Sequence, residues 1–359
     1  MQFEKALKRT LLDALDNNYT DNYDYYMHGE EDPSKWPQAW YREFNWKVPF
    51  VSKRKYVKKL MKRQATKCQF LYDRLQSPKE KELLLKLVAF RQLGLRRVKL
   101  PDSQDYFETV GQLMAEFDEL RGEKLGGDFM FDLYLTDFSS YGFPVKIYAG
   151  ALTLYYEVLK DQYQYSEVGF KVEKGDILID AGACVGDSTF FFASRVGSSG
   201  KVFAFEMLPA NLRVLYKNVS LNAEEFQNIK VFECPLAEES DKEFYIVENG
   251  PASCISEKAP KDTSQAVVVK SMSIDSLVKE EKLDKVDMIK MDIEGAELSA
   301  LKGAVDTIKS FRPKLAICVY HRECDFDEIP RYIDSLGMDY KFHLKHHGIQ
   351  QGETVLYCL

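Results

Sequence analysis

One short run of residues, IKMDIEGAE at 289–297, combines a lysine with three acids that could carry out acid–base chemistry. Lys290 falls inside an apolar run that is predicted to be a strand, where charged side chains are seldom buried without partners. Asp292 comes at the expected end of that strand, Glu294 follows in a loop, and Glu297 falls in the first turn of the next helix. We interpret the run as a functional cluster, because open α/β sheets bind ligands at the carboxyl ends of their strands. The alternative is a structural ion pair followed by ordinary acids at a helix start.

A histidine ends the next apolar run, KLAICVY at 314–320. If the two strands are neighbours, His321 and Asp292 lie at the same sheet edge, and either could take a proton from a hydroxyl group. We expect Asp292 or His321 to act as the base, Glu294 to orient the hydroxyl and Lys290 to keep Asp292 ionised. Asp292, Glu294 and His321 could also bridge a metal ion, but the pattern does not require one and no metal is predicted.

The segment ILIDAGACVGD at 177–187 predicts a buried strand, a tight glycine turn and a helix start, which is typical of a nucleotide-binding βα unit. Asp180 ends the strand, and Gly182 and Gly186 open the helix. Of the three glycines in the dinucleotide pattern G-x-G-x-x-G, only Gly182 is present, and no Gly-Lys-Ser/Thr of a P-loop follows. A reduced glycine set suits a ligand without a pyrophosphate, so we predict S-adenosylmethionine (SAM).

An acid, Glu206, ends the following apolar run, VFAFE at 202–206. An acid at this strand end can accept hydrogen bonds from both ribose hydroxyl groups of a nucleotide. The alternative is a solvated acid at a helix start. We favour the ribose role because the glycine turn lies one βα unit earlier.

Short β-rich and helical runs alternate after residues 150–170, which predicts a parallel sheet with helices on both faces. Strands are predicted at 176–181, 202–206, 229–234, 286–292, 314–320, 340–345 and 353–358. Helices are predicted at 187–197, about 209–222, 296–310 and 327–336, with an inserted hairpin or excursion over 242–249 and 266–272. Seven strands with a closing hairpin indicate the α/β, class I (Rossmann-like) methyltransferase sheet, not the six-stranded dinucleotide fold.

The first part of the chain is predicted to be mainly helical, with long segments at 53–75 and 78–97. We therefore expect two domains, a helical N-terminal region over 1–150 that serves acceptor recognition or oligomer contact, and the catalytic domain over 151–359. All three tryptophans fall close together in the first region: Trp36, Trp40 and Trp46. They form either a platform for sugar rings or the core of a small helical domain. The acid-free basic stretch 47–72 either binds a phosphorylated acceptor or is a solvated helix face or a subunit contact.

Composition limits the partners of the protein. The net charge of −7 and the pI near 5.5 disfavour a nucleic-acid backbone as the main partner. The N-terminus has no apolar signal core, and no run approaches the length of a membrane span. Seven scattered cysteines without a C-x-x-C pair indicate reduced thiols. We expect a cytoplasmic enzyme with a small-molecule or saccharide acceptor and an option to form a homo-oligomer.

Several segments closely resemble FkbM-type SAM-dependent methyltransferases: FEMLPAN, KMDIEGAELSALKGA, RPKLAICVYHRECDFDEIP and ETVLY. DAGACVGD resembles the first motif of that family, and the resemblance covers about 160–359. It implies a seven-stranded class I fold and methyl transfer to a hydroxyl oxygen, frequently on a sugar or a polyketide-type metabolite. Two positions depart from the common pattern, because Cys184 replaces an asparagine and Met207 replaces a proline. These departures leave open the fine shape of the cofactor pocket.

The resemblance also implies roles for individual residues. The methionine part of SAM is assigned to five of them: Asp180, Gly182, Gly186, Asp187 and Ser188. Glu206 would hold the ribose while Asn211 supports its loop, and Leu236 and Ala237 lie where such domains place the adenine. The segment Gln162–Tyr163 resembles one that the family places near the cofactor.

The leading interpretation is an O-methyltransferase for a carbohydrate-like or natural-product hydroxyl group. Two alternatives are an RNA or protein methyltransferase and a SAM-binding regulatory or scaffold protein without catalysis. The acidic balance and the lack of a Pro-Pro-Tyr-like motif after the strand at 286–292 disfavour methylation of a nucleic-acid base. The acids at 292, 294 and 297 disfavour loss of catalysis.

Overall fold

A computed structural model describes residues 2–19, 22, 50–64, 67–101, 106–127, 129, 132–247, 254–256 and 266–359. The three tryptophans of the predicted aromatic cluster lie outside the described residues. The chain divides into two compact units. The first comprises Met1–Gln112, Val319–Ser335 and Asp339–Cys358, and the second comprises Leu113–Cys318, Leu336–Met338 and Leu359. These units do not test whether residues 1–150 and 151–359 fold independently, so the domain boundary predicted near residue 150 stays a prediction.

The central feature of the fold is a seven-stranded sheet with the strand order β12-β13-β11-β10-β4-β5-β6. The strands β11, β10, β4, β5 and β6 are parallel, whereas β12 and β13 form an antiparallel pair. Their bounds are β4 (Ile177–Ala181), β5 (Lys201–Phe205), β6 (Ile229–Phe232), β10 (Met288–Met291), β11 (Lys314–Cys318), β12 (Phe342–His346) and β13 (Thr354–Cys358). The predicted sheet of seven strands with a closing hairpin is confirmed.

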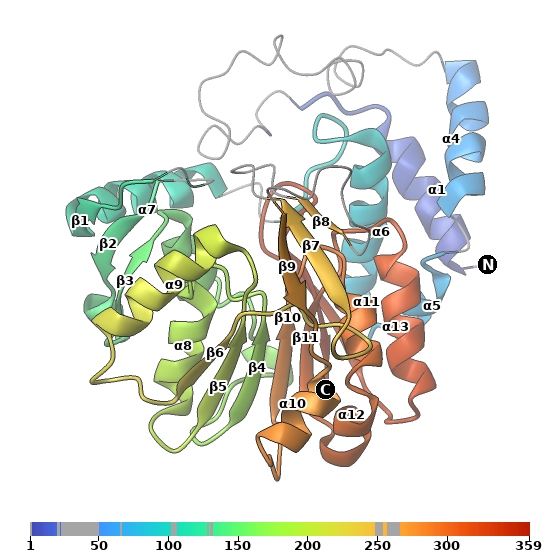
Figure 1. The fold of residues 1–359 in the computed structure, drawn as a ribbon. Helices are drawn as coiled ribbons and strands as arrows, with labels where there is room; N and C mark the ends of the chain where they lie inside the picture. Colours follow the sequence, from blue (N-terminus) through green and yellow to red (C-terminus); the bar gives the residue numbers. More distant parts are fainter. Residues whose placement is uncertain are drawn as a thin grey trace. The chain divides into compact units, whose positions relative to one another are not determined.

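The strand order reverses between β4 and β10, which are neighbours in the sheet although they are far apart in the sequence. The helices that follow β4 and β5 are α8 (Asp187–Val196) and α9 (Pro209–Leu221). The helices beyond the reversal are α10 (Ile274–Glu280), α11 (Glu297–Lys302) and α12 (Val305–Phe311). The two groups of helices lie on opposite faces of the sheet (Figure 1), as right-handed crossover connections require. The carboxyl ends of β4 and β10 thus form the switch point where such sheets bind ligands.

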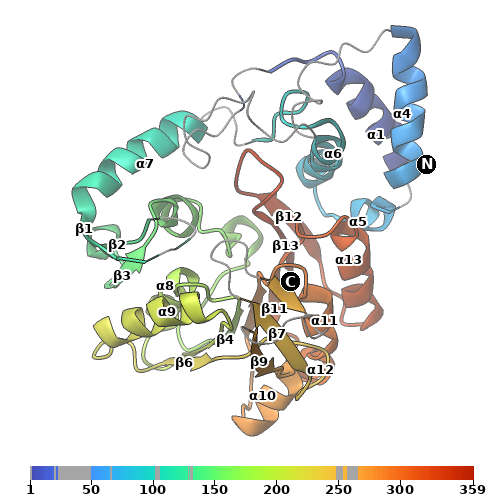
Figure 2. The ribbon, with the colours of Figure 1, turned by 45° about the horizontal axis from the view of Figure 1, so that its top comes forward.

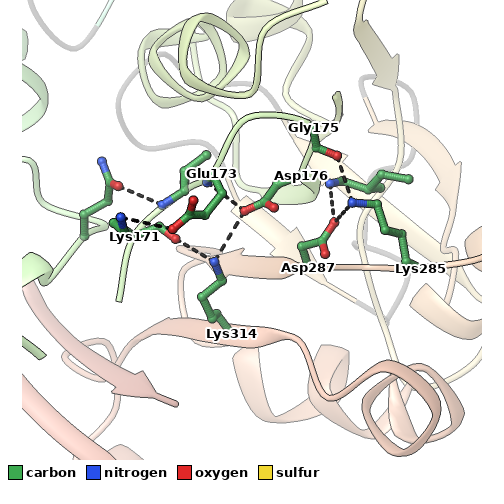
Figure 3. A network of polar contacts seen from close by, with 10 residues as sticks. Lys171, Glu173, Gly175, Asp176, Lys285, Asp287 and Lys314 are labelled. Atoms are coloured by element: carbon green, nitrogen blue, oxygen red, sulfur yellow. Dashed lines mark hydrogen bonds and ion pairs between the residues drawn. The ribbon is translucent and has the colours of Figure 1, made fainter. Parts of the chain in front are cut away.

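Ion pairs fix the opposite end of the sheet, where β4, β10 and β11 begin (Figure 3). The Asp287 carboxylate accepts a hydrogen bond from the backbone N–H of Ile177 at 2.7 Å and forms an ion pair with the Lys285 ammonium at 2.8 Å. Lys314 reaches the Asp176 carboxylate at 3.4 Å. These contacts hold the starts of the three strands together, at the end of the sheet opposite the switch point.

The helices of the first unit pack through apolar faces. They are α1 (Gln2–Ala14), α4 (Phe50–Gln64), α5 (Gln69–Arg74), α6 (Pro78–Leu93) and α13 (Asp325–Ser335). Figure 2 shows α1 beside α4 and α6. Ser77 and Glu80 form a capping box at the start of α6, and Glu80 also contacts Nδ1 of His343 in β12 at 2.8 Å. In the described part of the chain, no helix is long and apolar enough to cross a membrane.

The structure differs from the predicted elements in two places. After α7 (Tyr106–Leu120), three strands form a small antiparallel sheet in a region predicted to be helical: β1 (Arg121–Lys124), β2 (Tyr134–Asp137) and β3 (Lys146–Ala149). These strands are four residues long, too short for a clear alternation of apolar residues. The predicted helix at 296–310 is two helices, α11 and α12, that meet at Gly303. A Cβ there would lie 2.1 Å from the carbonyl oxygen of Ala237, so this contact requires glycine at the break.

The predicted excursion between β6 and β10 is a three-stranded antiparallel sheet with the order β8-β7-β9. Its strands are β7 (Glu243–Val247), β8 (Cys254–Ser256) and β9 (Ala266–Lys270). β7 and β9 match the two predicted segments, and β8 adds a strand that was not predicted.

The turn between β4 and α8 packs directly against the end of β10. Gly182, Cys184 and Gly186 all have positive φ angles, of +87°, +50° and +96°. A Cβ on Gly182 would lie only 1.9 Å from the carbonyl oxygen of Asp292. Gly182 is therefore required twice, by its left-handed backbone and by the close approach of the neighbouring strand end.

This double requirement predicts unequal costs for two glycine substitutions. Gly169 has a φ of +84°, and no atom lies within 4 Å of its Cβ position. Gly169→Ala should therefore lower the free energy of unfolding by about 1–2 kcal/mol through backbone strain alone. Gly182→Ala should cost about 1–3 kcal/mol more, because its Cβ displaces the end of β10. Urea unfolding of both variants measures the difference, and equal losses would contradict the proposed packing.

Candidate active site

A buried ion pair joins β4 to β10 at the switch point. Lys290 and Asp180 are direct register partners in these parallel strands, so their side chains point to the same face. The Lys290 ammonium lies 2.9 Å from Oδ1 of Asp180, and both side chains are almost completely shielded from solvent. The other carboxylate oxygen, Oδ2, accepts hydrogen bonds from Ser188 at 3.0 Å and Thr189 at 2.6 Å, in the first turn of α8. Asp180 thus joins β4, β10 and α8.

Lys290 has two further neighbours. Its ammonium donates a hydrogen bond to the carbonyl oxygen of Gly182 at 2.7 Å and lies 5.0 Å from the centre of the Tyr163 ring. Burial alone would lower the pKa of Lys290, but the carboxylates of Asp180 and Asp292 outweigh it and raise this pKa above the usual value. Lys290 therefore stays charged, with Asp180 as its ion-pair partner.

Tyr163 connects this pair to the predicted base. Its hydroxyl group donates a hydrogen bond to Oδ2 of Asp292 at 2.8 Å, while its ring faces the Lys290 ammonium. The sequence interpretation had Lys290 acting on Asp292 directly. In the structure Lys290 forms its ion pair with Asp180 and influences Asp292 through the electric field and through the shared neighbour Tyr163.

The loop after β10 contains the remaining acids of the predicted cluster. Glu294 is exposed and has a φ of +55°, and Gly295 follows with a φ of +94°. Glu297 is buried, and its Oε1 accepts hydrogen bonds from the backbone N–H groups of Ile293 at 3.0 Å and Gly295 at 3.3 Å. Glu297 therefore holds the shape of the loop, and Glu294 is the acid of this loop that faces solvent.

The end of β5 places a second buried carboxylate near the glycine turn. Oε1 of Glu206 accepts hydrogen bonds from the backbone N–H groups of Met207 at 2.6 Å and Leu208 at 2.8 Å. Oε2 accepts one from the Asn211 side chain at 3.0 Å. Burial raises the pKa of Glu206, and these donors counteract part of the rise. The contacts orient the carboxylate, and its predicted role toward ribose stays a prediction.

The start of α8 contains the two residues predicted near the amino acid part of SAM. Asp187 is the first residue of α8 and accepts hydrogen bonds from the backbone N–H of Ser188 at 3.1 Å and from the Thr153 hydroxyl at 3.5 Å. Burial raises the pKa of Asp187, against the attraction of Lys290. Of these two residues, Ser188 donates its hydroxyl hydrogen bond to Asp180. Asp187 is therefore the residue of the two whose side chain could contact a ligand.

The segment predicted to lie beside the adenine is firmly held. Leu236 and Ala237 are buried, and the backbone N–H of Ala237 donates to the carbonyl oxygen of Met272 at 3.0 Å. Contact with a ligand stays a prediction for both residues.

The predicted alternative base, His321, belongs to the first compact unit, whereas Asp292 belongs to the second. Its ring packs against that of Tyr320, with 4.1 Å between the centroids. The pairing of His321 with Asp292 stays a prediction. Among the described residues, no group of three or more His, Cys, Asp or Glu side chains is arranged to hold a metal ion.

Sequence reasoning missed one acidic residue of this region. Glu157 lies in a π-helix, Leu154–Leu159, and is buried. A single acid in the apolar run LYYEVL was the available signal, because an acid in such a run needs a reason to be buried. Tyr163 was singled out only by its resemblance, and its contact with Asp292 depends on tertiary structure.

The buried ion pair predicts non-additive effects on stability. Lys290→Met leaves the Asp180 carboxylate buried without its cation, so it should lower the free energy of unfolding by about 3–5 kcal/mol. The double variant Asp180→Asn/Lys290→Met removes both charges and should lose less than the two single variants together. Urea unfolding of all four proteins gives the coupling energy. Strictly additive losses would show that the pair contributes no specific interaction.

Comparisons with known proteins bear on the family and the fold of the chain. Residues 180–342 match the family profile described as methyltransferase FkbM domain. The structure is similar to that of methyltransferase FkbM from Methylobacillus flagellatus, with 22% sequence identity and a TM-score of 0.53. That match covers 83% of this chain and 60% of the other, so the chain spans less than two thirds of its relative and the likeness supports the fold alone.

Two further solved structures are more distant. Fibrillarin from Aeropyrum pernix, solved with natively bound S-adenosyl-L-methionine, has 12% identity and a TM-score of 0.33, over 52% of this chain and 68% of that one. A SAM-dependent O-methyltransferase from Thermotoga maritima has 14% identity and a TM-score of 0.33, over 55% and 64%. With TM-scores this low, neither structure supports a conclusion about the fold or the activity of this chain.

No curated protein sequence matches the chain. The family match includes the strand ends, the glycine turn and the acid loop whose geometry is described above. The chain contains a methyltransferase domain of the FkbM family.

Proposed function

We propose that the protein is a SAM-dependent O-methyltransferase that acts on a hydroxyl group of a carbohydrate-like or natural-product acceptor. The observation that carries the proposal is the arrangement at the switch point. There the glycine turn after β4 adjoins an oriented base candidate, Asp292, at the end of β10. The second carboxylate, Glu206, follows β5, the other neighbour of β4.

The charge of this region fits SAM. The cofactor carries a sulfonium and an ammonium charge, and the acids around the glycine turn, Glu157, Asp187 and Glu206, offer negative partners. A dinucleotide fits less well, because its pyrophosphate would occupy the N-terminus of α8. That position is the site of Asp187, which would repel the pyrophosphate.

In the proposed site the residues divide the work. Gly182 and Gly186 admit the methionine part beside the turn, Glu206 holds the ribose, and Leu236 and Ala237 adjoin the adenine. The cofactor, when bound, supplies a methyl group already activated by its sulfonium charge. The protein therefore has mainly to align an oxygen with that carbon and to exclude water.

Asp292 is the proposed general base. Tyr163 donates a hydrogen bond to its Oδ2 and so orients the carboxylate, which would accept the proton of the acceptor hydroxyl. Glu294, exposed in the adjoining loop, would orient the acceptor. His321 is kept as the alternative base, since it follows β11, the neighbour of β10.

Asp292→Asn should reduce the rate of methyl transfer by about 10²–10⁴-fold, because the amide cannot take the proton, while SAM affinity should stay unchanged. The rate is measured as S-adenosylhomocysteine formed with a panel of sugars and hydroxylated metabolites, and affinity by calorimetry. Asp284→Asn is the matched control, since Asp284 is an exposed acid just before β10. Its turnover should equal that of the unmodified protein.

The same measurements separate the alternatives. Normal turnover in both Asp292→Asn and His321→Ala, with unchanged SAM binding, would refute the assignment of the base. SAM binding without S-adenosylhomocysteine on any acceptor would instead favour a regulatory or scaffold protein.

A further inference from the structure

The helix α4 presents a cluster of cations at the surface of the first unit. Four of its side chains are exposed cations: Arg54, Lys55, Lys58 and Lys59. At 3.6 residues per turn they fall within about 140° of the helix circumference. α4 contains no aspartate or glutamate, and among the described residues none of the four cations forms an ion pair. These four residues are called the basic face of α4 below.

The opposite side of α4 packs against α1. Its residues Val57, Leu60 and Met61 are buried, and α1 is the helix beside it (Figure 2). Lys53, on this side of the helix, forms an ion pair with Asp16, just after α1. Apolar packing and one ion pair therefore hold α4 on the first unit, and the basic face is left exposed.

The basic face differs from the exposed sides of other helices in this chain. On three of them an acid four residues away pairs with a cation: Arg9–Asp13 at 3.7 Å on α1, Lys86–Glu82 at 2.9 Å on α6 and Arg331–Asp327 at 2.7 Å on α13. On α4 the neighbours at this spacing are like charges, Arg54 with Lys58 and Lys55 with Lys59. Such pairs destabilise a helix. Solubility does not explain them, because a surface of mixed charge also provides it.

The shape of the basic face matches an extended anionic surface. Its four cations come from one convex helix, so their charged ends diverge, whereas a pocket for a single phosphate needs polar groups that converge. Three of the four are lysines, which lack the planar fork that arginine uses on nucleic acids. A helix that reads duplex DNA enters the major groove, but α4 has α1 along one side. These features favour a layer of lipid headgroups.

We propose that the basic face of α4 docks the protein on an anionic lipid bilayer. The contact is electrostatic and peripheral, because the apolar side of α4 is covered by α1. The whole chain has a net charge of −7, so acids prevail elsewhere and only a concentrated basic surface would attract the bilayer. The contact therefore also sets the orientation of the first unit on the membrane. It does not depend on the proposed methyl transfer, so either can fail without the other.

The test is sedimentation of the full chain with vesicles of phosphatidylcholine that contain about 30% phosphatidylserine, at about 0.1 M salt. The native protein should bind these vesicles and not vesicles of pure phosphatidylcholine. Raising the salt to about 0.5 M should abolish binding, because salt screens the attraction. Each of the single variants Lys55→Gln, Lys58→Gln and Lys59→Gln should weaken binding about fivefold, and the triple variant roughly 100-fold.

The matched control is the triple variant Lys279→Gln/Lys309→Gln/Lys341→Gln, at three exposed lysines on other elements. It makes the same change in net charge, so its vesicle binding should equal that of the native protein. A second control, Lys55→Arg/Lys58→Arg/Lys59→Arg, keeps the charge of the basic face and should also bind as the native protein does. Circular dichroism of each variant checks that the helices are retained.

Three results would overturn the inference. The first is a native protein that does not bind the phosphatidylserine vesicles, or that binds pure phosphatidylcholine equally well. The second is equal weakening by the two glutamine triple variants, which would show that net charge and not the basic face decides binding. The third is release of the bound protein by a short DNA duplex at equal charge concentration, which would assign the basic face to nucleic acid instead of lipid.

Discussion

The ion pair between Lys290 and Asp180 is the interaction on which the rest of the site depends. It joins two strands that are adjacent only because the strand order reverses between them. The same lysine holds the carbonyl oxygen of Gly182, and the same aspartate holds the first turn of α8 through two hydroxyl groups. One buried contact therefore fixes the glycine turn, a helix start and the end of β10 in a single arrangement.

The pair also explains how the other charges are distributed. Lys290 is paired with Asp180, and its attraction offsets only part of the effect that burial has on the other acids near the turn. Asp187 and Glu157 are left in a shielded region with pKa values raised by burial. A bound cation would favour the charged form of these carboxyl groups and a bound anion would oppose it, so the region favours a cationic ligand. The same electrostatics that stabilise the fold thus support the choice of SAM over a dinucleotide.

The sheet could be predicted from the sequence because each parallel strand is a short apolar run, and four of the five (β4, β5, β6 and β10) have an acid at or just after the carboxyl end. The residue types of the site were also visible, since Lys290 and Asp292 stand out in such a run. The register of β10 against β4 could not be predicted. The pairing of Lys290 with Asp180 depends on which strands are neighbours and on how they align. The pattern of residues within one strand does not give this information.

The features that sequence analysis missed were missed for the same physical reason. Glu157 lies in a π-helix, which has no simple sequence pattern, and its acid could not be linked to Asp187 before the π-helix was placed beside α8. The strands β1, β2 and β3 are too short and too polar to show alternation. Local sequence predicts elements well when each contains its own apolar pattern, and poorly when tertiary contacts decide the backbone.

A crystal structure of the protein with S-adenosylhomocysteine tests the central claim most directly. The ligand should lie at the carboxyl ends of β4 and β5, with its ribose at Glu206. The Lys290 ammonium should keep its contact with Asp180 in the complex. A Lys290 side chain that leaves Asp180 to bind the ligand, or a ligand bound away from the glycine turn, would contradict the account.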